Sequence, residues 1–522
     1  MIKLLYESVD HWAKQSPDKE AFCYLDQSIT YRELSHLTSR LAGVLMANGI
    51  KRGDRVGVFL AKSLESTIAI YGIMKAGAAF VPLDPAASPE RLGGMINHCG
   101  INCLISHPDM QTKLQDILTS FDDITCVIGV NSVDAPDIQT MDWDQVAHAP
   151  IVPPARIIAQ DIAYIMYTSG STGAPKGITH THASGLAYAH AITELYDVQP
   201  ADRFGNHAPL HFDISTFDYF AAPLRGATTV IIPEPYMKMP ASLSELMEKE
   251  RLTLWFSAPN ALIQLLLNGV LEARDLQSLR WVIFGGEPFP PKYLSALMTQ
   301  WPQARFSNSY GPAEVNMCSY YHIDAPLAKD ADAIPIGRMW DIAEGVIVDE
   351  MDRPVAQGEQ GELLVRAPTR MRGYWNAPEL NANCFYTRPV SAGINDIFYR
   401  TGDIVVDAGE NRLMFLGRKD RQIKLRGYRI ELDEIEYVLA THPDVEEAAA
   451  YMIVSGAFIE AAVTIKTGSE LNTAALTDYC MAKLPNYAIP KTIRIIEVFP
   501  RTTSQKIDRR VLGQMYDGAK DV

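Results

Sequence analysis

The stretch that decides the fold is Tyr167-Thr-Ser-Gly-Ser-Thr-Gly-Ala-Pro-Lys-Gly177, which follows the apolar segment Ile162–Met166. It combines glycines and small hydroxyl side chains, which leave backbone N–H groups accessible, with the cation of Lys176. Anionic polyphosphates are bound by this combination of groups. The segment therefore predicts a loop that holds ATP, although a cluster of Gly, Ser and Thr taken alone is also typical of a surface turn.

Two other loop motifs are excluded at this position. A Walker A loop has Gly before its lysine and Ser or Thr after it, whereas Pro175 precedes Lys176 and Gly177 follows it. A nucleophile elbow has the pattern Gly-x-Ser-x-Gly, which is absent from this segment. The phosphate-binding loop is therefore of a different type.

On both sides of this loop, short apolar strands alternate with helices. We expect helices over Tyr31–Asn48 and Ser63–Ala76 and strands over Arg55–Leu60 and Ala78–Leu83. Strands that alternate with helices form parallel sheets whose faces the helices cover. The predicted fold class is thus α/β, with a large N-terminal region of stacked α/β layers. Further strands are expected at Ile162–Tyr167, Ala227–Ile232, Leu252–Ser257 and Trp281–Phe284.

The pattern changes in the last third of the chain. Short runs divided by turn residues between Ile334 and Phe415 predict hairpins and hence a β subdomain. A charged segment after Gly417 and a helix expected over Glu431–His442 indicate the start of another domain. We therefore divide the chain into an N-terminal core of residues 1–419 and a small mobile α+β domain of residues 420–522.

Length, charge and cysteine content narrow the class of protein. The chain has 522 residues, more than a single core usually supports, and a net charge of −15 at pH 7. Broad binding to nucleic acid or to an anionic membrane is therefore disfavoured. No apolar run is long enough to span a bilayer, and the seven cysteines form no Cys-x-x-Cys pair. We expect a cytoplasmic protein with reduced thiols.

Four further segments follow the loop in order. Together with the loop they resemble the motifs of the adenylate-forming superfamily, which includes acyl-CoA synthetases, luciferases and the amino-acid adenylation domains of nonribosomal peptide synthetases. The resemblance covers roughly residues 10 to 510 and implies the fold of these enzymes. The segments are Asn308-Ser-Tyr-Gly-Pro-Ala-Glu314, Tyr399-Arg-Thr-Gly-Asp403, Gly417-Arg-Lys-Asp-Arg-Gln-Ile-Lys-Leu-Arg-Gly427 and Pro500-Arg-Thr-Thr-Ser-Gln-Lys-Ile-Asp-Arg509.

The resemblance implies a reaction in two steps. A carboxylate attacks the α-phosphorus of MgATP and pyrophosphate leaves, and a thiol then attacks the acyl adenylate. Lys506 would be the catalytic lysine of the first step, although this chain has Gln505 where the family usually has Gly. Lys424 would lie near the active site in the thioester-forming arrangement, and Asp420 would be the hinge between the two arrangements.

The resemblance also implies the residues that hold the nucleotide. Tyr310 would stack on the adenine, Asp403 would accept both ribose hydroxyls, and Arg418 would approach the ribose. Glu314 would bind Mg²⁺. The other expected ATP-binding residues are Thr168, Ser169, Gly170, Ser171, Thr172, Gly173, Lys176, Gly286, Glu287 and Asn308.

Asp213, in His211-Phe-Asp-Ile-Ser-Thr-Phe217, aligns with the acidic residue that amino-acid adenylation domains use for the substrate ammonium. A buried carboxylate needs a partner, and an ammonium supplies one. The alternative for Asp213 is the N-cap of a helix over Ile214–Leu224. The other substrate-binding positions implied by the resemblance are Ile214, Phe217, Ser257, Ile283, Gly285, Ser309, Met317 and Cys318.

No second charge stands among these positions, so we expect an uncharged, mainly apolar substrate side chain. The segment Gly311-Pro-Ala-Glu-Val-Asn316 and the length of the chain resemble free-standing prolyl-AMP ligases. L-Proline is therefore the first expectation for the substrate, and another small apolar amino acid is the second.

The acceptor of the activated acid is expected to be a separate molecule. No serine-bearing attachment motif of a carrier domain follows Lys506, so a phosphopantetheinyl carrier protein would act in trans, with free coenzyme A as the alternative. An acyl- or aryl-CoA ligase is the second candidate function, and Asp213 distinguishes the two: formation of a coenzyme A thioester from a carboxylic acid that lacks an amine would favour the ligase. A nucleotide-sensing protein without turnover is the third, which the presence of Lys506 and Glu314 disfavours.

Overall fold

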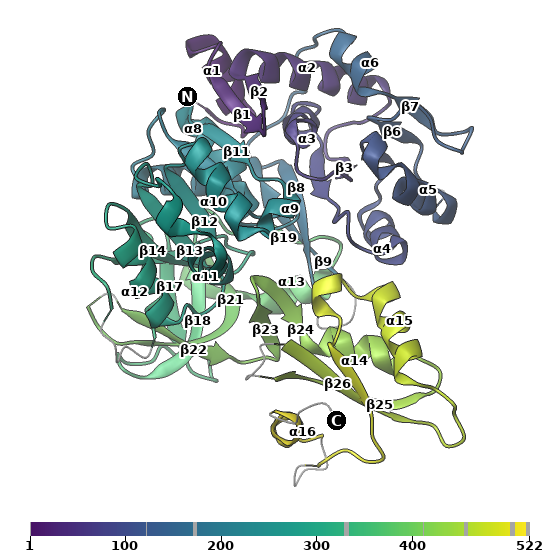
Figure 1. Ribbon diagram of the computed structural model, residues 1–522, viewed down its shortest axis with the longest axis vertical. Helices are drawn as coiled ribbons and strands as arrows, with labels where there is room; N and C mark the ends of the chain where they lie inside the picture. The colour runs from purple at the N-terminus through teal and green to yellow at the C-terminus, as the bar shows by residue number, and fades with distance from the viewer. Residues whose placement is uncertain are drawn as a thin grey trace.

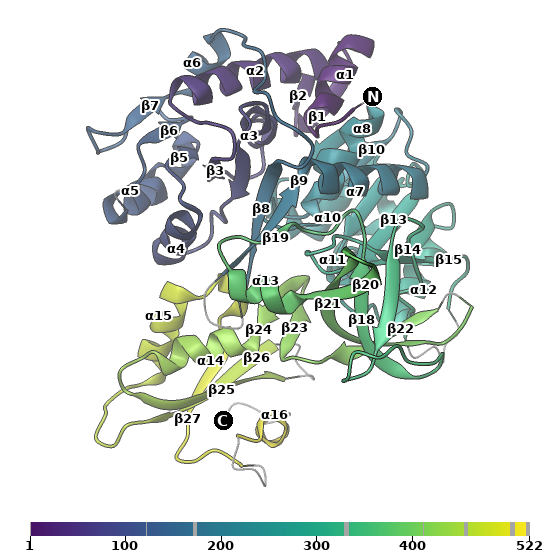
Figure 2. The same cartoon turned by 180° about the vertical axis from the view of Figure 1, so that it is seen from behind.

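The structure is a computed structural model that describes residues 2–121, 123–170, 175–327, 333–410, 412–453, 458–501 and 507–517. A large N-terminal part carries a smaller C-terminal domain, which lies at the bottom of Figure 1. Figure 2 shows the same two parts from behind. This mixed architecture of sheets and helices confirms the predicted α/β fold class. Among the described residues, no helix is both long and apolar enough to cross a membrane.

An eight-stranded sheet carries the predicted phosphate loop. Its strands are β3 (Arg55–Val58), β4 (Ala79–Pro82), β5 (Cys103–Ile105), β6 (Cys126–Ile128), β7 (Gln139–Met141), β8 (Ile162–Thr168), β9 (Lys176–Thr181) and β19 (Gly373–Tyr374). They lie in the order β19-β9-β8-β4-β3-β5-β6-β7. The strands from β8 to β7 are parallel, whereas β9 returns antiparallel to β8. The loop therefore joins two neighbouring strands of one sheet.

A nine-stranded sheet lies beside the first. Its strands are β1 (Glu20–Tyr24), β2 (Gln27–Thr30), β10 (Arg203–Asn206), β11 (Thr228–Ile231), β12 (Leu254–Ser257), β13 (Trp281–Gly285), β14 (Arg305–Tyr310), β15 (Ser319–Ile323) and β16 (Arg338–Met339). The order is β16-β15-β14-β13-β12-β10-β11-β1-β2. The central strands from β14 to β1 are parallel, as expected for strands that alternate with helices.

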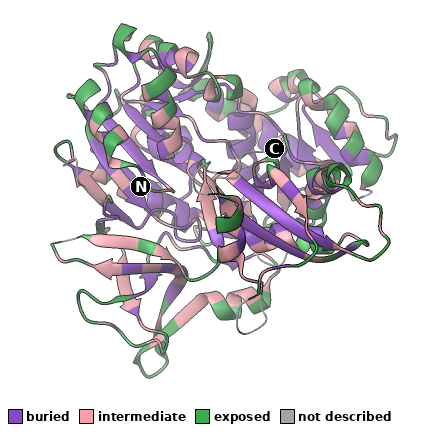
Figure 3. Ribbon diagram, turned by 60° about the horizontal axis from the view of Figure 1, so that its bottom comes forward, coloured by how far each residue is buried: buried purple, intermediate pink, exposed green. Residues whose placement is uncertain are grey.

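Helices cover the faces of both sheets. Those around the first sheet are α2 (Tyr31–Ala47), α3 (Leu64–Lys75), α4 (Pro89–Cys99), η1 (Pro108–Met110), α5 (Gln111–Ser120) and α6 (Trp143–His148). Those around the second are α1 (Glu7–Gln15), α7 (His182–Leu195), the π-helix η2 (Phe217–Ala221), α8 (Ala222–Arg225), α9 (Glu234–Met237), α10 (Pro240–Lys249), α11 (Pro259–Asn268), η3 (Leu271–Ala273) and α12 (Pro291–Gln300). Figure 3 shows that the sheets are mostly buried while the outer helix faces are exposed.

Aromatic side chains join the two sheets in a common core. Phe220 of η2 lies against Phe80 and Tyr164, whose rings stack at a centroid distance of 5.5 Å on the first sheet. The rings of Phe22 in β1 and Tyr71 in α3 lie edge to face, with a distance of 6.4 Å between their centroids. Burial of such large rings is the main stabilising contribution to the core. The relative position of the two sheets is therefore fixed next to the phosphate loop.

An antiparallel β subdomain follows, as the turn-rich sequence predicts. It contains β17 (Glu344–Val348), β18 (Gln360–Arg366), α13 (Pro378–Cys384), β20 (Phe385–Ser391), β21 (Ile394–Asp407) and β22 (Leu413–Arg418). The strands pair in the order β17-β18-β21-β20, and β22 also pairs with β21. Strand β21 contributes Asp403 to the pocket between the subdomain and the two large sheets.

The C-terminal domain begins with a hairpin and continues with a three-stranded sheet. Its elements are β23 (Gln422–Leu425), β24 (Tyr428–Glu431), α14 (Leu432–Ala440), β25 (Val445–Ile453), β26 (Phe458–Ile465), α15 (Thr473–Lys483), η4 (Asn486–Ala488), β27 (Thr492–Ile495) and α16 (Arg509–Tyr516). Alternate residues of β25 face α14 and α16, since Ala450 packs with Leu439 and Ala449 with Leu512. The hairpin β23–β24 reaches toward the N-terminal part (Figure 1).

Candidate active site

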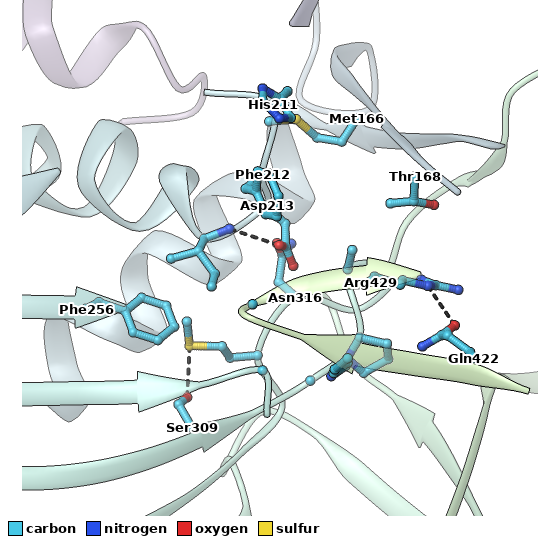
Figure 4. Close-up of a pocket in the computed structure, with 18 of the residues that line it drawn as sticks. Met166, Thr168, His211, Phe212, Asp213, Phe256, Ser309, Asn316, Gln422 and Arg429 are labelled. Carbon is cyan, nitrogen blue, oxygen red and sulfur yellow. Dashed lines mark hydrogen bonds between the residues drawn. The ribbon is translucent and has the colours of Figure 1, made fainter. Parts of the chain in front are cut away.

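A pocket lies where the N-terminal part meets the hairpin β23–β24 (Figure 4). One wall comes from the end of β8, and another comes from the turn that contains His211 and Asp213. The third wall is the segment from Gly311 to Met317 after β14, and the hairpin closes the fourth side. Loops at the carboxyl ends of parallel strands commonly form such sites. The topology therefore brings together four stretches that are distant in the sequence.

The described part of the phosphate loop meets the hairpin. Thr168 lines the pocket, and its buried hydroxyl has no hydrogen-bond partner among the described residues. The Ser169 hydroxyl donates to the backbone carbonyl of Arg429 at 2.9 Å, and Lys176 Nζ lies 3.9 Å from a carboxylate oxygen of Glu431. Gly170 is described beside them, whereas Ser171, Thr172 and Gly173 fall outside the described residues. The loop is thus next to the hairpin and opens into the pocket.

Tyr310, Asp403 and Arg418 form one hydrogen-bonded group, of which Asp403 and Arg418 line the pocket while Tyr310 lies behind it. The Tyr310 hydroxyl donates to the Asp403 carboxylate. Arg418 Nη1 lies 2.7 Å from the other carboxylate oxygen of Asp403. Burial and the neighbouring carboxylate raise the pKa of Tyr310 well above its usual value, so the phenol is a donor at all physiological pH values. Asp403, which we expect to accept the ribose hydroxyls, is therefore already bonded to Tyr310 and Arg418 in this arrangement.

Glu314 is fully buried and ion-paired with the C-terminal domain. Arg429 Nη1 lies 2.8 Å and 3.0 Å from its two carboxylate oxygens, and the Tyr374 hydroxyl donates to it at 2.7 Å. Burial alone would raise the pKa of Glu314, but Arg429 and Tyr374 lower it to about 2. The carboxylate is therefore ionised and neutralised by a guanidinium.

This environment does not fit a metal ion. Mg²⁺ prefers oxygen ligands in octahedral geometry, whereas both oxygens of Glu314 accept hydrogen bonds from Arg429. Within the described ranges no group of three or more His, Cys, Asp or Glu side chains could hold a metal. In this arrangement the expected Mg²⁺ ligand is thus occupied by a cation of the protein itself.

Asp213 lies in the pocket (Figure 4). Lys424 lines the same pocket. Burial raises the pKa of Asp213, and the Lys424 cation offsets part of this rise. Burial likewise lowers the pKa of Lys424. The only described hydrogen bond to the Asp213 carboxylate comes from the next backbone N–H, that of Ile214, at 3.0 Å. A carboxylate so poorly compensated is well placed to receive a cationic ligand.

The helix expected over Ile214–Leu224 begins within one residue of its predicted start, since residues 215 and 216 are helical and lead into a π-helix. The π-helix η2 starts at Phe217, and its N-cap is Thr216. Asp213 is therefore not the N-cap, and its side chain is free of that structural task. Single-turn π-helices often occur beside functional sites.

Apolar side chains line the pocket beyond Asp213. They are Tyr188, Ile214, Phe256 and Met317, with Ser309 as the polar neighbour. The Met317 sulfur accepts hydrogen bonds from the Ser309 hydroxyl at 2.8 Å and from the Tyr188 hydroxyl at 3.8 Å. Because these hydroxyls already have a partner, the wall offers an incoming side chain mainly apolar contacts.

Several predicted substrate positions lie behind this lining. Phe217, Ile283 and Cys318 are buried in the core, and Ser257 turns its hydroxyl to Ala258 and Trp255. Gly285 lets β13 approach β14, because a Cβ there would lie 2.1 Å from the Ser309 carbonyl oxygen.

Among the predicted nucleotide residues near them, Gly286 lines the pocket and Glu287 accepts from the Gly427 N–H at 3.0 Å. Asn308 does not line it and donates to the Pro335 carbonyl at 2.8 Å.

Sequence reasoning missed several residues of the pocket, among them Phe256, Arg429 and Tyr188. Phe256 precedes the predicted Ser257, and the alternation of side chains along β12 is the signal that separates them. Arg429 stands in the segment that follows Gly427 and could have been singled out as an arginine near the expected site. Tyr188 lies on α7 far from any motif, so no sequence signal identifies it.

The two ends of the C-terminal domain lie differently relative to the pocket. Lys424 lines it, whereas no residue of α16 does. Lys506 falls outside the described residues. Asp420 lies between β22 and β23, where its carboxylate accepts from Arg418 Nε at 2.8 Å and from the Gln422 N–H at 3.2 Å.

Comparison with known proteins places this geometry in a family. Residues 9–375 match the AMP-binding enzyme family, and residues 434–506 match the AMP-binding enzyme C-terminal domain. The chain is 31% identical over 524 residues to an L-proline–(L-prolyl-carrier protein) ligase of Pseudomonas fluorescens, with 99% of this chain and 100% of that protein covered. It is 34% identical over 518 residues to a linear gramicidin synthase of Brevibacillus parabrevis, with 97% of this chain covered, but it spans only 6% of that protein's length.

Solved structures share the fold. The adenylation domain AlmE of Vibrio cholerae, solved in complex with glycyl-adenosine-5'-phosphate, superposes with a TM-score of 0.85 at 23% identity, covering 99% of both chains. A likeness at this identity shows a common architecture, which agrees with the sheets and the small domain described above. With a family match over most of its length and a full-length relative above 30% identity, the chain belongs to the AMP-binding enzyme family.

Proposed function

We propose that this enzyme activates an amino acid with ATP, releases pyrophosphate, and transfers the aminoacyl group to the phosphopantetheine thiol of a separate carrier protein. The observation that carries the proposal is Asp213, a half-buried carboxylate in the pocket whose only described hydrogen bond comes from the backbone N–H of Ile214. A substrate ammonium would compensate it, whereas a fatty or aryl acid would not. The full-length relative that ligates L-proline to a carrier protein supports the same interpretation.

The substrate side chain is proposed to be small and apolar. Ile214, Phe256 and Met317 would surround it, and no charged side chain beyond Asp213 and Lys424 lies on that side among the described residues. L-Proline is the leading candidate, because its secondary ammonium can pair with Asp213 and its ring is compact. Another small apolar amino acid is the alternative.

In the first step, the substrate carboxylate attacks the α-phosphorus of ATP. The protein mainly has to position the reactants and neutralise charge that builds on the phosphoryl oxygens. We assign the phosphate loop with Lys176, and Lys506, to this task. Asp403 and Tyr310 would hold the ribose and the adenine. Mg²⁺ at Glu314 belongs to the proposal only in an arrangement where Arg429 has left that carboxylate.

In the second step, a thiol attacks the aminoacyl adenylate and AMP leaves. Lys424 lines the pocket in the arrangement described above, which suits this step, because a cation there would stabilise the departing phosphate. Lys506 would have to enter the same pocket in the first step. We therefore propose that residues 420–522 reorient about Asp420 between the two steps.

The acceptor is proposed to be a carrier protein in trans, with coenzyme A as the alternative. The described residues hold all seven cysteines as free thiols, which is compatible with a reaction in the cytoplasm. We infer both the carrier protein and the cytoplasmic location from the proposed reaction, and not from a surface of the structure that would bind the carrier protein.

Amino-acid-dependent ATP–pyrophosphate exchange tests the proposal. We expect exchange with proline or a small apolar amino acid, and a loss of about 10²–10³ in rate for Lys506→Ala. Lys466→Ala, which removes an exposed lysine from the same domain, is the matched control and should be near normal. Exchange with no amino acid, together with coenzyme A thioester formation from an acid that lacks an amine, would replace the proposal by an acyl- or aryl-CoA ligase.

A further inference from the structure

We infer that Lys62 is a positioning residue for Asp213, because it fixes the backbone at the start of the segment that carries Asp213. The inference rests on the proposed function, in which Asp213 binds the substrate ammonium. Lys62 lies in the turn between β3 and α3, beside the first sheet, whereas Asp213 follows β10 of the second sheet. It stands outside the five segments that carry the family resemblance.

Lys62 has a buried ammonium that bonds to the main chain of the other sheet, and the residue is 2% exposed. Its Nζ donates to the carbonyl oxygens of Asn206 at 2.8 Å and of His207 at 2.9 Å, where the chain leaves β10. Burial lowers the pKa of Lys62 to about 7, while the Asp218 and Glu234 carboxylates oppose this change. Because a buried ammonium is costly unless its donors are bonded, the lysine holds these two carbonyls in place.

The segment that Lys62 holds is closed into a loop by a second buried bond. Asn206 Nδ2 donates to Asp218 Oδ2 at 2.9 Å, and both side chains are fully buried. Burial raises the pKa of Asp218 well above its usual value, and the Asn206 amide and the Lys62 cation offset part of this rise. Residues 207–217, which include Asp213, therefore form a loop whose base is the bond between Asn206 and Asp218.

The far end of the loop is bonded to the helix that follows Lys62. The Tyr71 hydroxyl of α3 donates to the carbonyl oxygen of Tyr219, and the Thr229 hydroxyl of β11 donates to that of Asp218 at 2.9 Å. Helix α3 and the turn before it therefore hold both ends of the loop. The part between the two ends, residues 211–214, lines the pocket.

The Asp213 carboxylate depends on these anchors for its position. Among the described residues it accepts one hydrogen bond, from the backbone N–H of Ile214, and no side chain donates to it. An ion pair with an ammonium depends on the distance and the direction between the two groups. Since no side chain orients the carboxylate, the backbone places it, and Lys62 fixes where that backbone starts. Loss of Lys62 should therefore weaken recognition of the ammonium and leave the binding of ATP nearly unchanged.

Discrimination against an acid that lacks the amine measures this recognition. The quantity compared is kcat/KM in ATP–pyrophosphate exchange for the amino acid and for the same acid with hydrogen in place of the amino group, which for proline is cyclopentanecarboxylic acid. Lys62→Met keeps the length of the side chain and removes its donors. We expect it to lower the preference for the amino acid by about tenfold or more, with the KM for ATP unchanged. An unchanged preference in this variant would overturn the inference.

Lys75→Met is the matched control, because Lys75 is a buried lysine at the other end of α3. It donates to Asp10 at 2.6 Å and to the Ser35 carbonyl at 3.1 Å, and it does not line the pocket. Its loss should lower the Tm but change the preference by less than about twofold, since distant sites act independently. An equal fall of the preference in both lysine variants would assign the effect to lost stability and overturn the inference.

A double-mutant cycle gives a second measurement that needs only the amino acid. If Lys62 acts through Asp213, Lys62→Met combined with Asp213→Asn should have a KM for the amino acid within about twofold of that of Asp213→Asn alone. Multiplication of the two losses would overturn the inference. Where Lys62→Met does not yield folded protein, Asn206→Ala removes the bond at the base of the loop and carries both measurements with the same expected directions. Failure of the proposed function shows in the unmodified enzyme, as exchange that no amino acid supports.

Discussion

Arg91 of α4 and Glu434 of α14 form a buried ion pair between the two domains. Arg91 Nη1 lies 2.9 Å from Glu434 Oε1, and the side chains are 8% and 1% exposed. Close by, the Ser88 hydroxyl donates to the Ala482 carbonyl at 2.6 Å. Taking two charges out of water is costly unless they pair, so the arrangement described here depends on this contact, and separation of the domains would rehydrate both groups.

Arg91→Ala should therefore slow transfer to the thiol more than it slows adenylation. In the docked arrangement it leaves Glu434 buried without a partner, and we expect transfer to fall by about tenfold or more. Single-turnover transfer and pyrophosphate exchange measure the two steps separately. Lys483→Ala, which breaks only the exposed pair with Glu90, should change transfer by less than about twofold. Equal losses in both steps would contradict a role in docking.

Asp213→Asn should raise the KM for the amino acid by about 10- to 100-fold. This change corresponds to the loss of a hydrogen bond to a charged group, which contributes about 1.5–3 kcal/mol. The ATP dependence should change little, because Asp213 is assigned to the ammonium. Exchange assays over a range of amino-acid concentrations test this. An unchanged KM would remove the observation on which the proposed substrate class depends.

Asp213→Asn should also change how the stability of the protein depends on pH. Burial raises the pKa of Asp213, and Lys424 and Arg429 offset only part of the rise. The protein without substrate is therefore less stable above this raised pKa than below the unfolded value, because folding then has to bury a charge. Asp213→Asn should raise the Tm at neutral pH, and the gain should vanish near pH 4. A lower Tm at neutral pH would show that the carboxylate is compensated in the folded state.

Asp420→Pro should impair thioester formation more than adenylation. Proline fixes φ at the residue to which we assign the reorientation. Asp420→Ala is the matched control, since it also loses the hydrogen bonds from Arg418 and Gln422 but keeps the backbone free. If both variants behave alike, the carboxylate matters and the hinge assignment is wrong.

Phe256→Ala should shift the amino-acid preference toward larger side chains. Phe256 lines the pocket and is 2% exposed, so its removal enlarges the space beside Ile214 and Met317. A cost in stability of about 3–5 kcal/mol is expected for a buried Phe. Ser257→Ala, one residue further along β12, should leave the preference unchanged. An unaltered preference in Phe256→Ala would place the side-chain pocket elsewhere.

Much of the fold is predictable from local patterns. Helix α2 is expected over Tyr31–Asn48 and is found over Tyr31–Ala47, because a capping box of Thr30 and Glu33 fixes its start. Strand β8 is expected at Ile162–Tyr167 and ends one residue later. The helix after Asp213 starts within one residue of its predicted start, but local propensity does not reveal that its middle part, Phe217–Ala221, is a π-helix.

The candidate site is less predictable. Motifs can propose Ser169 and Lys176 for phosphate and Glu314 for Mg²⁺, but not that one strand of the other domain contacts all three residues. The motif points to Ser257 in place of Phe256, because a motif transferred by position ignores which face of a strand each side chain takes.

The amino-acid sequence by itself determined the α/β class and the order of the family segments, because these depend on periodicity and on residues close together in the chain. Only the tertiary structure decided that Arg429 meets Glu314 and that Lys424 enters the pocket beside Asp213. These contacts join residues on separate domains, so they depend on how the two bodies pack and on which buried charges find partners. No local rule contains that information.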